Sequence, residues 1–248
     1  MNKKTLLMLA LSVATLSGAA SNHDSETKNE DTLSVALKGN FRYCNTYEQF
    51  VNKDWKKLDT LYCEGHSKSH QLWVGGNDFK FTTGDKNTDK ALKKDAFIVM
   101  VNDTMYINCR NLRFEKTSFG SGYTKAKNVG AHSLLFVNTM IGKEAQSKQA
   151  MSGFMFGAIG GAISASQQMK QQVCYIVSSG ADAKGNVNIR FVNDELVEKM
   201  LAKHEGLLKV YYSERKKTKR QLATHVLPLL EKAGIFEPKN EANKPAWE

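Results

Sequence analysis

Proline is nearly absent from the chain. Only three of its 248 residues are proline, Pro228, Pro238 and Pro245, so residues 1–227 contain none. This excludes collagen-like, mucin-like and proline-rich linker structures for most of the chain. Hydrophobic residues make up 41% and charged residues 24%, which is typical of a folded globular protein rather than of a disordered one.

Sequence signatures of catalysis are also lacking. The patterns GxSxG, HExxH and CxxC do not occur, and neither does a phosphate-binding glycine loop. Residues 213–216 match the SxxK pattern, but no KTG partner exists, so we interpret this match as chance. We therefore predict no catalytic residue and no cofactor, and the sequence favours a non-enzymatic function.

The chain has few long apolar segments without charge. The first of these segments, near the N-terminus, predicts export. Lys3 and Lys4 precede the apolar run Thr5–Leu16, and small residues follow it up to Ala20. This order is typical of a secretory signal peptide, here residues 1–20, and it predicts a protein of the periplasm or cell envelope. The polar residues 21–32 are expected to form a disordered tail.

The second apolar run lies in a segment, residues 151–169, that we predict to be a glycine-rich helix. Gly153, Gly157, Gly161 and Ala165 recur every four residues, so they form one stripe along a helix. Such a stripe lets another backbone approach closely, as in membrane helix pairs. Isolated in water the helix would be poor, because each glycine costs about 1 kcal/mol relative to alanine.

Three structures could cover this helix. The uncharged part, residues 151–165, rises only about 22 Å, which is short of the roughly 30 Å of a hydrocarbon core. The core of the protein itself, a membrane, and a second copy of the helix in an oligomer all remain open. We define residues Gly153, Gly157, Gly161 and Ala165 as the glycine stripe.

Alternation of apolar and polar residues predicts β-strands in the rest of the chain. Two hairpins are expected: a tight one over residues 96–109, and one over residues 173–192 with a turn region at residues 180–185. Thr46–Trp55 has the spacing of a short amphipathic helix. Further strands are predicted at Leu58–Cys63, Gln71–Val74, Phe79–Thr82 and Leu134–Val137. We predict a loop for the glycine-containing segment 118–129.

Helices are predicted after the second hairpin. Asn193 or Asp194 is expected to cap the first of them, and Gly206 to end it. An amphipathic helix over residues 207–236 follows, which Pro228 kinks or divides. We therefore predict an α+β fold for residues 33–236, with a mainly antiparallel sheet or partial barrel, the glycine-rich helix within it and C-terminal helices. Residues 237–248 are expected to be a tail.

The four cysteines leave two interpretations open. Cys44, Cys63, Cys109 and Cys174 are an even number in an exported chain, which permits two disulfides in any of three pairings. They can equally be buried thiols that pack as small apolar groups.

The densest group of metal-ligating residues is Cys63, His66 and His70, with Glu64 between them. The two histidines would share a metal ion on a helix, where positions four apart lie on one face. Gly65 and the serines around Lys68 favour a turn instead, so we predict no metal site and keep these residues as weak ligand candidates.

The strongest charge feature is a basic run near the C-terminus. Arg215, Lys216, Lys217, Lys219 and Arg220 place five positive charges in six residues, in a chain whose net charge is +10. The run is either a solvated helix face or a contact for an anionic partner. In an exported protein we expect lipid phosphates or lipopolysaccharide rather than nucleic acid, and no aromatic platform for RNA accompanies the run.

Four segments also resemble a known group of proteins. They are residues 46–50 (TYEQF), 105–110 (MYINCR), 156–161 (FGAIGG) and 170–175 (KQQVCY). Together they resemble a family of exported proteins from Bacteroidetes for which no activity is known. The resemblance implies export but no active site. We expect a non-enzymatic envelope protein that self-associates or contacts a membrane through the glycine stripe. The alternatives are a soluble periplasmic binding or structural domain with that helix buried, and a metal- or thiol-dependent enzyme that uses Cys63, His66 and His70.

Overall fold

The computed structural model describes residues 34–67, 77–142, 172–180 and 187–236. The strands are β1 Ser34–Ala36, β2 Phe41–Cys44, β3 Lys56–Leu58, β4 Tyr62–Gly65, β5 Phe79–Thr82, β6 Ile98–Val101, β7 Thr104–Asn108, β8 Arg113–Phe114, β9 Thr117–Ser118, β10 Tyr123–Val129, β11 Ser133–Thr139, β12 Gln172–Ser179 and β13 Val187–Phe191. The helices are α1 Tyr47–Val51, α3 Lys86–Lys94, the 3₁₀ turn η1 Cys109–Asn111, α6 Asp194–Met200, α7 Glu205–Ser213, α8 Lys217–Arg220 and α9 Ala223–Lys232.

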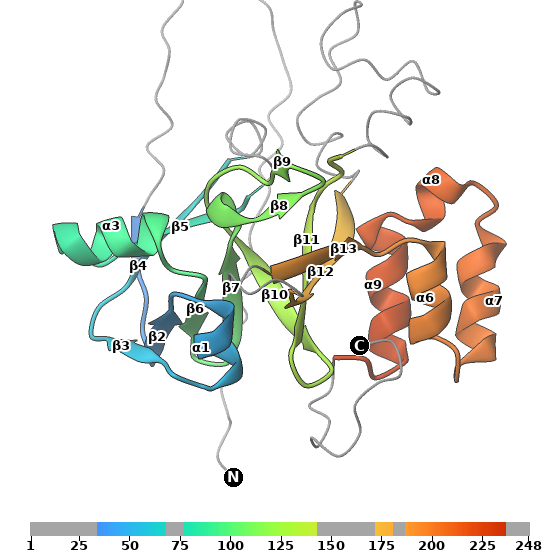
Figure 1. The fold of residues 1–248 in the computed structure, drawn as a ribbon, viewed down its shortest axis with the longest axis horizontal. Coiled ribbons are helices and arrows are strands. Elements are labelled where there is room, and N and C mark those ends of the chain that lie inside the picture. The colour runs from blue at the N-terminus through green and yellow to red at the C-terminus, as the bar shows by residue number, and fades with distance from the viewer. Residues whose placement is uncertain (1–33, 68–76, 143–171, 181–186, 237–248) are drawn as a thin grey trace, which may run out of the picture. The chain divides into compact units, whose positions relative to one another are not determined.

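One antiparallel sheet organises most of these elements, and β8 and β9 form a separate pair (Figure 1). Its strand order is β1-β4-β5-β10-β7-β6-β2-β3, and β11, β12 and β13 continue from β10. The sheet therefore branches at β10, which pairs with β5, β7 and β11 and curves into a half-barrel. The predicted α+β class with a mainly antiparallel sheet is confirmed. The predicted glycine-rich helix lies outside the described residues.

Both predicted hairpins form. In the first, β6 and β7 pair around Asn102, which has a positive φ of 54° as such a tight turn requires. In the second, β12 pairs with β13, and Asn193 then caps α6 by accepting a hydrogen bond from the Leu196 backbone N–H. The short helix α1 also forms, with Thr46 as its cap.

The C-terminal helices differ from their prediction. Instead of one helix divided at Pro228, the chain forms α7, α8 and α9, with breaks before Lys217 and before Ala223. Pro228 lies inside α9, and Gly206 lies in the first turn of α7 rather than at a break. The Glu214 backbone, which ends α7, and the Leu222 backbone, which precedes α9, are both extended, so the helices are separated without proline or glycine.

Strand β12 separates two hydrophobic cores. Tyr175 and its alternate neighbours face the interior of the half-barrel, whereas Cys174 and Ile176 face α6, α7 and α9. The strand is buried on both faces, which explains why its sequence is continuously apolar rather than alternating. The isolated bridge between Val173 and Leu222 also joins the start of this strand to the residue before α9.

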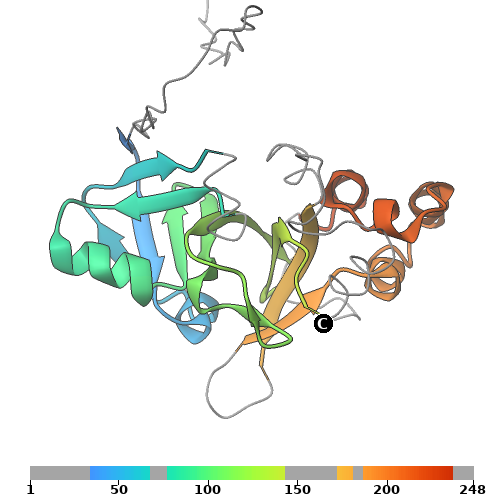
Figure 2. The same ribbon diagram turned by 90° about the horizontal axis from the view of Figure 1, so that it is seen from above.

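The helices that pack on this face lie together at one end of the sheet. Figure 2 shows α7 as the helix farthest from the sheet, with α6 and α9 nearer to it. The buried Tyr211 side chain of α7 belongs to the same core as α6 and α9, which fixes α7 in place. The outer face of α7 and the turn into α8 are thus presented to solvent on a packed helical layer.

Candidate functional site

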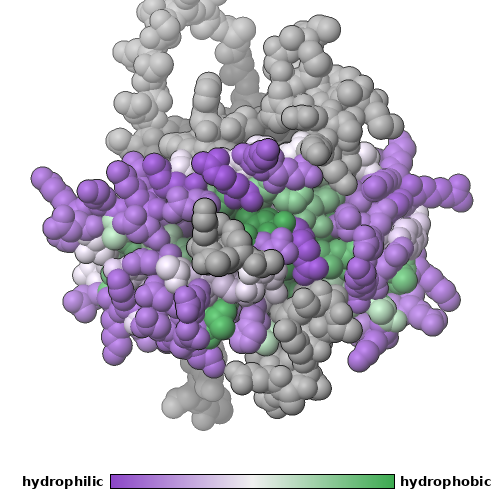
Figure 3. Space-filling view, viewed as in Figure 1, coloured by the Kyte–Doolittle hydropathy of each residue, from purple (hydrophilic) through white to green (hydrophobic). Residues whose placement is uncertain are grey.

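Four of the five residues of the basic run are exposed. Arg215 and Lys216 lie in the connection after α7, and Lys217 and Lys219 lie on α8. Between residues 203 and 220 the chain has seven Lys and Arg residues and only two acidic residues. In Figure 3 hydrophilic residues predominate over the helices, on the right of the view. The four exposed side chains, Arg215, Lys216, Lys217 and Lys219, are called the basic surface below.

Arg220, the fifth residue of the run, has a structural role instead. Its Nη2 and Nε atoms lie 2.5 and 3.1 Å from the two carboxylate oxygens of Asp194, and only 14% of its side chain is exposed. The guanidinium also stacks on the Tyr212 ring at 5.1 Å and donates to the Arg215 carbonyl oxygen. Arg220 thus differs from the other four residues of the run, because a carboxylate of the same chain already pairs with its charge.

Asp194 is the centre of this arrangement. Besides Arg220, the Tyr211 hydroxyl and the Gln221 side-chain amide donate hydrogen bonds to its Oδ1, at 2.8 and 3.0 Å. Partial burial raises the pKa of Asp194, but the hydrogen bonds from Arg220 and Tyr211 outweigh it and hold the pKa below its usual value. The carboxylate thus joins α6, α7 and α8, and it fixes the connection that carries the basic surface.

The sequence gives little sign of this network. Asp194 and Arg220 are 26 residues apart, and Asp194 reads equally well as a helix-capping acid. The adjacent tyrosines Tyr211 and Tyr212 are the one local feature that relates to this network. Tyr211 is buried and Tyr212 is exposed, and a buried tyrosine hydroxyl needs a hydrogen-bond partner.

Two further exposed lysines, Lys199 on α6 and Lys209 on α7, precede the basic surface in the chain. Lys199 forms an ion pair with Glu195 at 2.6 Å, one helical turn away, with both side chains mostly exposed. Lys209 lies on the exposed side of α7. Glu195 thus offsets the charge of Lys199 through an ion pair, and Glu205, one helical turn before Lys209 on the same exposed side of α7, offsets that of Lys209.

The glycine stripe lies outside the described residues, so its packing stays a prediction. No helix within the described ranges combines the length and the hydropathy that crossing a bilayer requires.

All four cysteines are free thiols, so neither of the two disulfides that their even number permits is formed. Cys44 and Cys109 belong to the core inside the half-barrel, Cys174 to the core under the helices, and Cys63 packs against a third core around Phe81. The alternative prediction, buried thiols that pack as small apolar groups, holds for three of them, and Cys63 is half-buried. Burial raises the pKa of Cys44 to about 12 and raises those of Cys109 and Cys174 as well, so these three are protonated and unreactive at neutral pH.

The weak metal candidates do not form a metal site among the described residues. Cys63 lies on β4 with its side chain against the third core, and Glu64, its neighbour on the strand, forms an ion pair with Lys80 at 2.8 Å. His66 follows the strand, and its Nδ1 lies 2.8 Å from the Asn77 carbonyl oxygen. His70 is outside the described residues. Within those ranges no three His, Cys, Asp or Glu side chains cluster closely enough to hold a metal ion.

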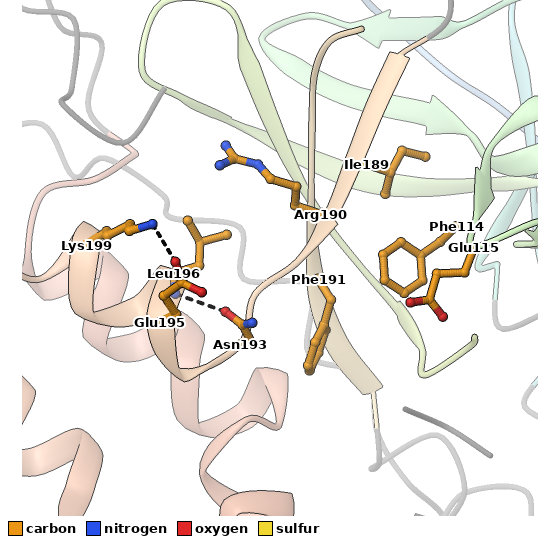
Figure 4. A pocket seen from close by; sticks show the side chains of 9 residues that line it. All are labelled: Phe114, Glu115, Ile189, Arg190, Phe191, Asn193, Glu195, Leu196 and Lys199. Carbon is orange, nitrogen blue, oxygen red and sulfur yellow. Dashed lines mark hydrogen bonds and ion pairs between the residues drawn. The ribbon is translucent and has the colours of Figure 1, made fainter. Parts of the chain in front are cut away.

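A pocket of about 320 Å³ lies between β13, the turn from β8 to β9, and α6 (Figure 4). Ile189 and Phe191 of β13 lie on the side of Phe114, whereas Arg190 points to the side of α6. The remaining lining residues are Glu115, Asn193, Glu195, Leu196 and Lys199. Two acidic and two basic side chains line the pocket, so their charges cancel and do not favour a particular class of ligand.

Comparison with known proteins identifies the family of this chain but no activity. No curated protein and no solved structure matches the chain. One family model, described as a family of unknown function (DUF6563), matches residues 42–236. The match spans the sheet from β2 onward and all the C-terminal helices, including the basic surface and Asp194. The chain therefore belongs to this family of unknown function.

Proposed function

We propose that the protein is an exported, non-enzymatic protein of the cell envelope that binds an anionic surface through the basic surface. The observation that carries the proposal is the exposure of Arg215 and Lys216 in the connection after α7 and of Lys217 and Lys219 on α8, both of which the Asp194 network holds in place. The signal-peptide pattern of residues 1–20 supports export. The envelope supplies anionic groups in lipid phosphates and lipopolysaccharide.

The arrangement suits binding to a charged surface better than recognition of one small anion. Lysine ammonium groups act as point charges on flexible stems, and three of the four residues are lysines. Near an anionic membrane each Lys or Arg contributes about 1 kcal/mol, an attraction that salt weakens over a Debye length of about 8–10 Å. The binding should therefore weaken steeply as ionic strength rises.

Neutralising Lys216, Lys217 and Lys219 together to glutamine is expected to weaken binding to anionic vesicles about 100-fold at low salt. The reason is the loss of about 1 kcal/mol for each lysine. Co-sedimentation with vesicles of phosphatidylcholine and phosphatidylglycerol measures the affinity, and pure phosphatidylcholine vesicles should bind neither protein.

The matched control neutralises three lysines elsewhere. Lys90, Lys93 and Lys94 of α3 are also exposed, and their replacement by glutamine changes the net charge by the same amount. This control should bind like the wild type. Equal loss in both triple variants would show a general effect of net charge, and no loss in the first would overturn the proposal.

We further propose that copies of the protein pack together through the glycine stripe. Gly157 lies at its centre, and the proposed partner is the same helix of a second copy. Gly157→Leu should abolish self-association, measured by analytical ultracentrifugation in detergent, and leave the melting temperature unchanged. If the helix is instead buried in its own fold, the same variant should lower stability by about 1–3 kcal/mol through overpacking. A variant that assembles and melts like the wild type would contradict both.

A further inference from the structure

Exposed large hydrophobic side chains are rare among the described residues, and they concentrate on one helix. Three such side chains are more than a third exposed: Val35 on β1, at 57%, and Val210 and Tyr212 on α7, at 49% and 38%. Singly exposed apolar residues need no explanation, but two of the three here lie within three residues of each other. They also lie directly before the basic surface in the chain.

The geometry of α7 brings apolar and basic groups to one side. At 100° per residue, Tyr211 marks the buried direction, so Lys209 and Ser213 lie on the opposite, outward face, and Val210 and Tyr212 flank them. The helix is the one farthest from the sheet (Figure 2), so no other described helix lies outside it. The Tyr212 hydroxyl donates to Glu198, which keeps that ring on the side of α6. Val210 is then the apolar group that is least held by contacts on this face.

We propose that the outer face of α7 is a peripheral docking surface for an anionic lipid bilayer. Lys209 and the basic surface contact the lipid phosphates, while the Val210 side chain enters the boundary between headgroups and acyl chains. The inference rests on the proposed function and adds the partner: a bilayer rather than a soluble phosphate compound. A soluble polyanion could bind the lysines, but it has no apolar part that would contact the exposed Val210 side chain.

Charge complementarity supports the choice of a bilayer. Glu205 and Glu214 are the two acidic residues between positions 203 and 220. Glu205 lies one helical turn before Lys209 on the same exposed side of α7 and offsets its charge, whereas Glu214 follows the helix. The net positive charge near Val210 therefore comes from the basic surface, which begins five residues after it. Positive charge beside an exposed apolar side chain is the combination found in helices that lie at a membrane interface.

The test compares two valines that are similarly exposed. Val210→Asp removes an apolar group and adds a negative charge, so it should weaken binding to phosphatidylcholine–phosphatidylglycerol vesicles about tenfold. Val35→Asp, on β1, makes the same chemical change and should bind the vesicles like the wild type. Binding of inositol hexakisphosphate, a soluble phosphate probe, should decrease far less in Val210→Asp than in the triple lysine variant, because the first adds one negative charge whereas the second removes three positive charges.

A second variant measures insertion directly. The fluorescence of the tryptophan introduced by Val210→Trp should be quenched by vesicles that contain brominated lipids, more strongly than that of the native tryptophans in the wild type. The tryptophan introduced by Val35→Trp should not be quenched in this way. If Val210→Asp binds vesicles like the wild type and Val210→Trp shows no added quenching, the bilayer proposal is wrong. In that case a loss of vesicle binding in the triple lysine variant would leave the proposed function standing, and an unchanged triple variant would overturn both.

Discussion

Replacing Asp194 with alanine is expected to lower the free energy of unfolding by about 3 kcal/mol. The carboxylate accepts hydrogen bonds from Arg220, Tyr211 and Gln221, and 21% of its side chain is exposed. Its removal leaves a largely buried guanidinium without its counter-charge. Breaking a fully buried pair costs about 3–5 kcal/mol, and the remaining exposure of this pair places it at the lower end of that range. Urea denaturation at neutral pH measures the change.

The neighbouring residue provides the matched control. Glu195 is also an acid in the first turn of α6, but both side chains of its ion pair with Lys199 are mostly exposed. Solvent and salt screen such a pair, so Glu195→Ala should lower the free energy of unfolding far less than Asp194→Ala does. Similar losses in the two variants would contradict the role that we give to Asp194.

The same network has a defined pH dependence. The pKa of Asp194 is lowered in the folded protein, so folding is favoured wherever the unfolded carboxyl would be ionised, above about pH 4. The contribution is complete above that value and is lost as pH falls through the lower pKa of the folded state. The difference in stability between the wild type and Asp194→Ala should thus be constant above about pH 5 and shrink below about pH 4. A difference that persists unchanged to about pH 2 would show that the carboxylate charge is not the cause.

Asp194→Ala also connects stability with the proposed function. The network holds α8 and the preceding connection against α6, and this connection carries Arg215 and Lys216. The protein would retain every lysine of the basic surface in the variant, but their relative positions would no longer be fixed. Electrostatic attraction to a vesicle depends mainly on the number of charges near the surface, so binding by the folded fraction should decrease much less than in the triple lysine variant.

Local patterns predicted the hairpins and caps, because their signals lie within a few residues. The pair β6 and β7, the pair β12 and β13, and the Asn193 cap all follow from alternation and turn or cap residues. The helix α3 was not predicted, because its apolar contribution to the core is essentially Leu92 alone. Its cap, the Asp85 side chain that accepts from the Thr88 backbone N–H, was the available signal.

The central strand β10 was mistaken for a loop for a different reason. Lys125 and Lys127 face outward, and glycines precede the strand, so the segment reads as polar and flexible. Its buried residues belong to three different cores: Tyr123 to the third core, Ala126 to the interior of the half-barrel and Val129 to the core under the helices. No single apolar face exists along the strand, so no period of two appears in its sequence.

The sequence alone reveals the cluster of basic residues, but it does not show which of these charges are exposed and which pair within the protein. Arg220 and Lys219 are adjacent and chemically alike, yet one completes an ion pair inside the helical layer and the other is exposed. The difference depends on Asp194, whose proximity comes from the packing of α6 against α8. Composition likewise left disulfides and buried thiols as open alternatives for the cysteines. In the structure all four are free, with Cys44 and Cys109 in one core and Cys174 and Cys63 each at another.

Replacing Tyr175 with alanine is expected to cost about 4 kcal/mol, the largest effect of any single substitution considered. The side chain is fully buried on β12, and its ring lies 5.5, 4.8, 5.6 and 5.9 Å from those of Phe114, Phe119, Phe136 and Phe191. Large-to-small changes of buried aromatic residues cost about 3–5 kcal/mol, because the transfer energy of the ring is lost and a cavity remains. Guanidinium denaturation followed by circular dichroism gives the loss.

Tyr175→Phe separates the ring from the hydroxyl. The hydroxyl oxygen accepts from the Ile141 backbone N–H at 3.0 Å and donates to the Thr139 carbonyl oxygen at 3.3 Å, so it fixes the end of β11. Phenylalanine keeps the ring contacts but removes a partner from both backbone groups, which should cost about 1–2 kcal/mol. Tyr212→Phe removes an exposed tyrosine hydroxyl and should cost less than Tyr175→Phe. If Tyr175→Ala costs no more than Tyr175→Phe, the aromatic cluster does not stabilise the half-barrel. If Tyr175→Phe is neutral, the stability at this position comes from the ring alone, and the end of β11 is held by its strand pairing with β12.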